Sequence, residues 1–96
     1  MQAPRRARAV VMVLGMDAAQ ADAETERWRR RGAVAVRAHD AHGLLRLATA
    51  VGPDVIVLDP RVPEKLVRHL KAHPVSSTAR IEWLPLTELA TEPRAA

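Results

Sequence analysis

Short apolar segments and longer amphipathic segments alternate along the chain. Four runs of β-branched and aliphatic residues are too short for helices and predict strands. The runs cover residues 10–14, 33–36, 55–58 and 81–86. They do not alternate between apolar and polar positions, which is typical of parallel strands covered on both faces. The run Val-Ile-Val-Leu at 55–58 is the most hydrophobic, so we expect it at the centre of the sheet.

The first two helices are predicted from their capping residues. Asp17 precedes a helix-favouring stretch that extends to residue 31, and Gln20 is placed to complete a capping box. Asp40 is the expected N-cap of a second helix over residues 41–51, which Gly52 and Pro53 end. The residues of this second helix that we expect to face the core are Leu44, Leu45, Leu47 and Ala48.

A third helix is predicted to begin at Pro63, because proline is favoured at the first helical position. Leu66 and Leu70 have the spacing of a core-facing stripe and should pack on the sheet. The last strand contains Pro85, which a strand tolerates only near its end or at a sheet edge. Trp83 in that strand either packs on the core or lies exposed on the edge as an interaction anchor.

The element order βαβαβαβ predicts one α/β domain with a doubly wound parallel sheet. We expect this domain over residues 10–88, with a basic flexible start at 1–9 and a flexible tail at 89–96. Sites in such sheets lie beyond the carboxyl ends of the strands. The residues expected at that rim are Gly15, Met16, Asp17, Asp59 and Thr87.

Composition narrows the possible functions. The chain has 96 residues, no cysteine and a net charge of +4. This length suits one domain, and the lack of cysteine excludes disulfides and thiolate metal sites and makes a cytoplasmic location the default. No apolar run reaches the roughly 18 residues that a membrane span needs. With Trp28 and Trp83 as the two aromatic residues, the chain lacks the stacking platform of a single-strand nucleic-acid binder.

Several residues occur in an order that points to one family. They are Gly32, Asp40, the Gly-Pro-Asp at 52–54, Asp59 directly after the strand at 55–58, Pro63, and Thr87 at the end of the last strand. From about residue 10 to residue 87, this order resembles the receiver domain of bacterial response regulators, of the CheY-like superfamily, whose sheet is flavodoxin-like. The resemblance implies that Asp59 occupies the phosphoacceptor position and Thr87 the switch position.

The chain departs from the receiver pattern where the chemistry takes place. Receivers hold Mg²⁺ with paired acids after the first strand, but the matching positions here are Gly15 and Met16, which offer no hard oxygen ligand. Asp17 nearby is a candidate metal ligand, although its position favours an N-cap. The family's lysine has no match, because Lys65 and Lys71 both lie on the third helix. We therefore expect no cofactor, and Mg²⁺ only if the site is intact.

The pattern also lacks the family's fifth strand and last helix, leaving four strands and three helices. We therefore expect a degenerate receiver-like signalling module that is not an enzyme, is not phosphorylated and acts through protein–protein contacts. Its fourth strand would be a sheet edge, so we expect a protein partner or a second copy to bind at residues 80–86, from Arg80 to Leu86.

Two alternatives remain open. One is a phosphoacceptor response regulator of a two-component phosphorelay, with Asp59 as the acceptor. The other is a small basic nucleic-acid-binding protein that uses the arginines at 29–31, although nucleic acid is the less favoured partner. His69 and His73 stand four residues apart on one helical face, but no third metal ligand accompanies them.

Overall fold

The computed structural model describes residues 8–85. Its strands are β1 (Val10–Leu14), β2 (Val34–Arg37), β3 (Val55–Leu58) and β4 (Arg80–Trp83), and its helices are α1 (Ala18–Arg30), α2 (Ala41–Val51) and α3 (Glu64–Ala72). The predicted alternation of strands and helices is confirmed. Thr87, Leu86 and the expected tail at 89–96 lie outside the described residues, as do residues 1–7 of the expected basic start. None of the helices within residues 8–85 is long and apolar enough to cross a membrane.

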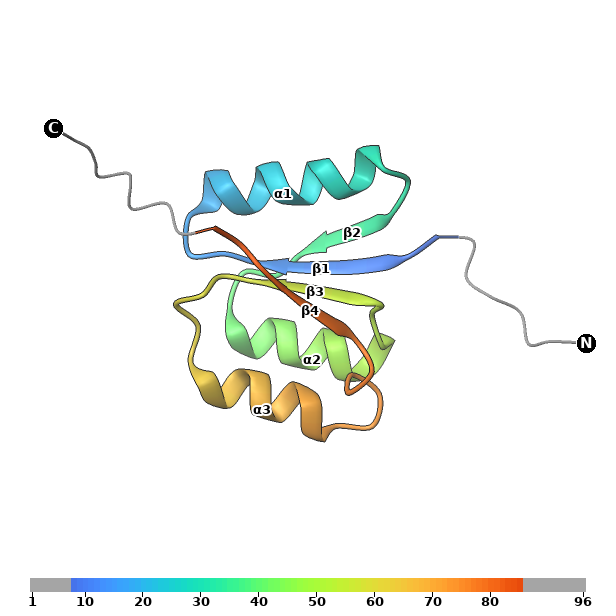
Figure 1. Cartoon of the computed structure of the whole chain (residues 1–96), viewed down its shortest axis with the longest axis vertical. Coiled ribbons are helices and arrows are strands. Elements are labelled where there is room, and N and C mark those ends of the chain that lie inside the picture. The colour runs from blue at the N-terminus through green and yellow to red at the C-terminus, as the bar shows by residue number, and fades with distance from the viewer. Residues whose placement is uncertain (1–7, 86–96) are drawn as a thin grey trace, which may run out of the picture.

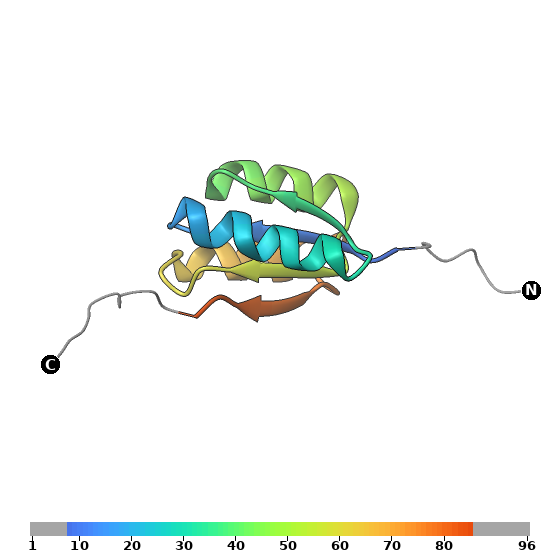
Figure 2. The ribbon, with the colours of Figure 1, turned by 90° about the horizontal axis from the view of Figure 1, so that it is seen from above.

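The four strands form one parallel sheet in the order β2-β1-β3-β4. Figure 1 shows α1 on one face of this sheet and α2 and α3 on the other, and Figure 2 shows the strands side by side from above. The doubly wound α/β prediction is therefore confirmed. β1 and β3 occupy the two inner places, so the expectation of a central position for the strand at 55–58 is correct.

The core consists of two apolar clusters, one on each face of the sheet. Alternate strand residues point to opposite faces, so Met12 and Ile56 pack under α2 and α3, whereas Val13 and Val57 pack under α1. Leu66 and Leu70 of α3 are buried on the sheet as predicted. Burying an aliphatic side chain of this size stabilises the fold by about 1.5–3 kcal/mol.

Two side-chain predictions are wrong. Leu47 is 41% exposed, because the buried stripe of α2 runs through Leu44 and Ala48 and leaves Leu47 on its outer flank. Asp17 does cap α1, accepting hydrogen bonds from the Ala19 and Gln20 amides, but the Gln20 side chain does not complete a capping box. Its Nε2 instead donates to the Pro85 carbonyl oxygen at 2.7 Å, which ties the start of α1 to the chain just after β4.

Some element boundaries also differ from the expectations. β4 is shorter than predicted, ending at Trp83, so Pro85 lies beyond the strand and interrupts no ladder hydrogen bond. Pro63 is the N-cap of α3 rather than its first residue, and β2 begins one residue late, at Val34. Such shifts of one or two residues are ordinary at the ends of elements.

Candidate functional site

Asp59 lies at the carboxyl rim of the sheet, directly after β3. Its backbone amide donates to the Leu14 carbonyl oxygen at 2.8 Å, which extends the pairing of β3 with β1 by one residue. The amide of Met16, two residues after the end of β1, donates to Asp59 Oδ2 at 2.9 Å. The Asp59 side chain is therefore held between the ends of the two inner strands, and the residue is fully buried.

The main partner of this buried carboxylate is Arg61. The chain turns at residues 59–62, where the Val62 amide donates to the Asp59 carbonyl oxygen at 3.1 Å. This turn brings Arg61 back onto Asp59: its Nε donates to Oδ1 at 2.8 Å and its Nη2 to Oδ2 at 2.7 Å. The Arg61 amide also donates to Oδ1 at 2.9 Å, the geometry of an Asx turn. Both carboxylate oxygens thus accept charge-assisted hydrogen bonds in a bidentate pair.

Arg61 controls the charge of Asp59. Its guanidinium hydrogen bonds hold the pKa of Asp59 far below the usual range, and the amides of Met16 and Arg61 lower the pKa further. Burial acts in the opposite direction but is outweighed. Asp59 is consequently ionised at any pH near neutrality. The Arg61 side chain is 46% exposed, so the pair has one fully buried member and one that reaches the surface.

Gly15, the first rim residue after β1, has little room for a side chain. A Cβ atom added there would lie 3.0 Å from Leu84 Cδ1 and 3.1 Å from the Ala21 Cβ. Both distances are shorter than an ordinary van der Waals contact of about 3.5–4.0 Å. Met16 contributes its amide to Asp59, while the residue as a whole is 55% exposed. An acid at residue 15 would therefore have to displace the packing between α1 and the end of β4.

The described residues do not fit a magnesium centre. Asp17 uses its Oδ1 to cap α1, with 2.9 Å to the Ala19 amide and 3.2 Å to the Gln20 amide. Asp59 is bound by Arg61, and a hard cation prefers free carboxylate oxygens. Within residues 8–85, no three His, Cys, Asp or Glu side chains form a group that could hold a metal ion. Thr87, the predicted switch position, lies outside the described residues.

Sequence reasoning did not identify Arg61. The spacing Asp-Pro-Arg contained a usable indication, because an aspartate at the start of a turn often accepts a hydrogen bond from the amide of the residue two positions later.

The sequence also indicated that His69 and His73 share one face of a helix, but it did not identify their neighbour on α2. The structure brings both to one hollow with His42, between α2 and α3.

The comparison with solved structures identifies the architecture. The crystal structure of a response regulator receiver protein from Pseudomonas putida aligns with this chain at a TM-score of 0.66 and 22% sequence identity. The alignment covers 88% of this chain and 75% of that one. The chain has a receiver-like fold. No family model matches the sequence, and no curated protein matches it. The roles of Asp59 and Thr87 remain predictions from the sequence.

Proposed function

We propose that this protein is a receiver-fold interaction module in which Asp59 is not phosphorylated. The observation that carries the proposal is the bidentate contact of Arg61 with the fully buried Asp59 carboxylate. Phosphorylation would require an Asp59 oxygen to approach phosphorus, with cations positioned to neutralise the phosphoryl oxygens. Here both oxygens already accept hydrogen bonds from Arg61.

The surroundings of Asp59 support a role without catalysis. Gly15 and Met16 supply no carboxylate, and Asp17 caps its own helix. Phosphoryl transfer depends on electrostatic stabilisation by aligned cations. A single half-exposed guanidinium that is already paired with the nucleophile offers little of that stabilisation. We therefore propose that the module binds other proteins and catalyses no reaction of its own.

Within the segment 80–86 predicted as a contact surface, β4 at residues 80–83 forms the sheet edge that we propose binds a partner. β4 is hydrogen-bonded to β3, and within residues 8–85 no strand pairs with its other side. Trp83 lies on this edge with 52% of its surface exposed, where its large ring can anchor a partner. The exposure of Trp83 agrees with one of the two readings of the sequence, and its role as an interaction anchor is part of the proposal. The partner is a protein or a second copy of this chain.

The nucleic-acid alternative is weakened by the contacts of the basic end of α1. Arg29 donates to the Ala35 carbonyl oxygen at 3.0 and 3.2 Å. Arg27 pairs with Glu24 at 3.0 Å, and Arg31 lies 4.6 Å from the centre of the Trp28 ring. These arginines thus have intramolecular roles, which favour a structural interpretation of the positive charge.

Phosphorylation can be tested with acetyl phosphate and Mg²⁺, followed by intact-mass measurement. We expect no mass gain in the wild-type protein under conditions that label an active receiver domain in a parallel sample. Asp59→Asn serves as the blank, and Arg61→Ala reports whether removing the guanidinium opens the carboxylate. Labelling of wild type that is lost in Asp59→Asn would overturn the proposal in favour of the phosphorelay alternative.

The edge can be tested by light scattering across a range of concentrations. We expect Trp83→Ala to reduce self-association, or capture of a protein partner, without lowering the melting temperature by more than a few degrees. Met16→Ala is a matched control, since Met16 is 55% exposed at a different place. A wild-type protein that stays monomeric at millimolar concentration and captures no partner would refute the edge as a contact surface.

A further inference from the structure

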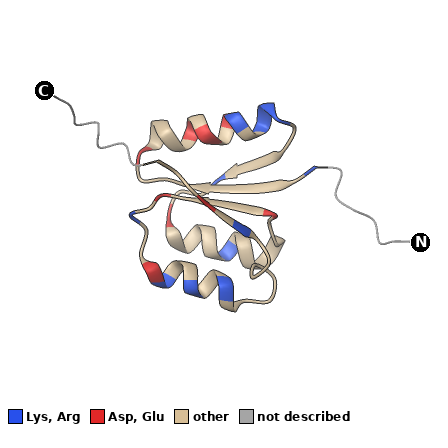
Figure 3. Ribbon diagram, in the orientation of Figure 1, with Lys and Arg blue, Asp and Glu red and all other residues tan. Residues whose placement is uncertain are grey.

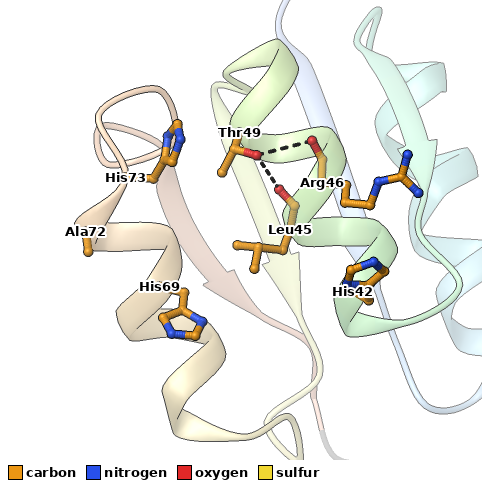
Figure 4. A pocket seen from close by; sticks show the side chains of 7 residues that line it. All are labelled: His42, Leu45, Arg46, Thr49, His69, Ala72 and His73. Carbon is orange, nitrogen blue, oxygen red and sulfur yellow. Dashed lines mark hydrogen bonds between the residues drawn. The ribbon is translucent and has the colours of Figure 1, made fainter.

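An elongated groove runs between α2 and α3 on the face of the sheet opposite α1. Its larger hollow has a volume of about 410 Å³ and is lined by His42, Leu45, Arg46, Thr49, His69, Ala72 and His73 (Figure 4). A smaller hollow of about 170 Å³ shares His42, Leu45 and His69 with the first and extends to Pro63 and Lys65. We call the two hollows together the α2–α3 groove.

The floor of this groove is apolar. Leu45 is partly buried against the core, and Ala72 of α3 also lines the groove. Thr49 donates its hydroxyl hydrogen to the Leu45 carbonyl oxygen at 2.8 Å, so its polar group is satisfied within α2. A ligand that lies here therefore meets mainly carbon atoms along the centre of the groove, and burying them favours binding.

The flanks of the groove are basic. His42 on α2 and His69 and His73 on α3 line it, and Lys65 adds a permanent positive charge at the end nearest Pro63. None of the residues that line the two hollows is acidic. Along the two helices, Lys and Arg side chains outnumber Asp and Glu: Arg46, Lys65, Arg68 and Lys71 stand against Glu64 (Figure 3). The charge is complementary to an acidic ligand.

The shape of the groove favours a helix over a small molecule. The two hollows share three residues; the larger one extends to Thr49 and His73 near the ends of α2 and α3, and the smaller one to Pro63 and Lys65 near the start of α3. The groove therefore follows the helices that border it. α2 has 11 residues, which corresponds to about 16 Å of helix. A helix of two to three turns can lie along that length and place an apolar stripe on the floor, as in other helix-in-groove contacts.

We infer that the α2–α3 groove binds an acidic amphipathic helix of a protein partner. The inference rests on the proposed function in one respect, that the module acts through protein contacts, and it names the partner's chemistry. Leucine-type side chains of the partner would cover Leu45 and Ala72. Its Asp and Glu side chains would pair with Lys65 and with the three histidines.

The charged or titratable side chains that line the groove are His42 and Arg46 from α2, and Lys65, His69 and His73 from α3. In Figure 4 the Arg46 guanidinium extends away from α3. None of these groups is acidic, so the lining offers an acidic helix no like-charge repulsion.

Two synthetic 15-residue helices provide the test. Both carry a leucine stripe at positions i, i+3, i+4 and i+7, and the remaining positions are glutamate-rich in one and lysine-rich in the other. We expect titration calorimetry to detect saturable binding of the glutamate-rich helix alone. Chemical-shift changes at the His42 and His69 rings should accompany it.

Substitutions locate the contact. His69→Glu and Ala72→Glu alter exposed residues and should each weaken binding of the glutamate-rich helix at least tenfold. His39→Glu is the matched control, because His39 is an exposed histidine that does not line the groove, and it should leave the affinity unchanged. Circular dichroism of each variant verifies the fold.

Two results would overturn the inference: no binding of the glutamate-rich helix up to 1 mM, or equal binding of both helices. Binding that His39→Glu weakens as much as His69→Glu would also reject this groove as the site. None of these outcomes affects the Asp59 labelling experiment, so failure here is distinguishable from failure of the proposed function.

Discussion

Arg61 binds both carboxylate oxygens of Asp59 from only two residues further along the chain, at 2.8 and 2.7 Å. A buried carboxylate without a partner would be strongly unfavourable, because it loses its hydration and gains nothing in return. The guanidinium offsets that loss with two parallel hydrogen bonds and a full positive charge. Arg61 is therefore the counter-charge of this site, a role that the sequence alone left unassigned.

Replacing Arg61 should destabilise the fold. We expect Arg61→Ala to lower the free energy of unfolding by about 1–3 kcal/mol, because it leaves a buried carboxylate with backbone amides as its remaining donors. Arg61→Lys should lose less, since lysine keeps the charge but not the bidentate geometry. Urea denaturation measures both.

Arg68→Ala is the control for this pair of variants. Arg68 is exposed and lies 3.7 Å from the exposed Glu64, so its removal should change stability by less than about 0.5 kcal/mol. If Arg61→Ala and Arg68→Ala had equal effects, the Asp59 contact would not be stabilising the fold.

Stability should depend on pH through Asp59. Because the folded pKa of Asp59 is depressed, its ionised form stabilises the fold fully above the unfolded pKa of about 3.9. This contribution is lost as the pH falls below that value and approaches the lower folded pKa. The stability difference between wild type and Asp59→Asn should thus shrink between pH 6 and pH 3. A difference that stays constant over this range would contradict the assignment.

Gly15 should tolerate no side chain without loss. We expect Gly15→Ala to destabilise the protein by about 1–3 kcal/mol, because the new Cβ would press on Leu84 and Ala21. The effect should exceed the gain of about 0.4–1 kcal/mol that alanine brings by restricting the unfolded chain. Thermal unfolding measures it, and Met16→Ala at the next, exposed position should shift stability by no more than about 0.5 kcal/mol.

Asp17 should act as a helix cap and not as a metal ligand. Asp17→Ala removes the acceptor of two α1 amides and should reduce stability by about 0.5–2 kcal/mol, whereas Asp17→Asn should retain most of it. Melting temperatures with Mg²⁺ and with a chelator measure the distinction. A Mg²⁺-induced increase in wild type that disappears in Asp17→Ala would show that this carboxylate does bind the cation.

The architecture could be predicted from the sequence because its information is local and periodic. β3 is uniformly apolar since both of its faces are buried, and Asp17 and Asp40 cap the helices that follow them. The prediction that Leu47 faces the core is wrong because Leu47 is apolar like a core residue, but its angular position around the helix axis places it on the flank of α2. Gln20 was misplaced because its partner, Pro85, lies 65 residues away.

The position of the candidate site could be predicted from the sequence, but the pairing of Asp59 with Arg61 could not. The carboxyl ends of parallel strands meet at one rim, so the place of Asp59 follows from topology. Arg61, by contrast, lies in a turn, where no periodic pattern predicts the direction of a side chain. The direction of this long side chain depends on which acceptor groups lie within its reach in the folded protein. The groove between α2 and α3 likewise needs two helices that are separate in the sequence to be placed against each other.

The cation that accompanies Asp59 is part of the polypeptide. It is present in a fixed ratio of one per carboxylate and cannot be diluted, chelated or exchanged with the medium. Its effective concentration at Asp59 is set by the covalent link through residues 59–61, and not by the concentration of a free ion in the cell. The charge balance at this rim is therefore fixed by the amino-acid sequence and should be the same at low and at high concentrations of divalent cations.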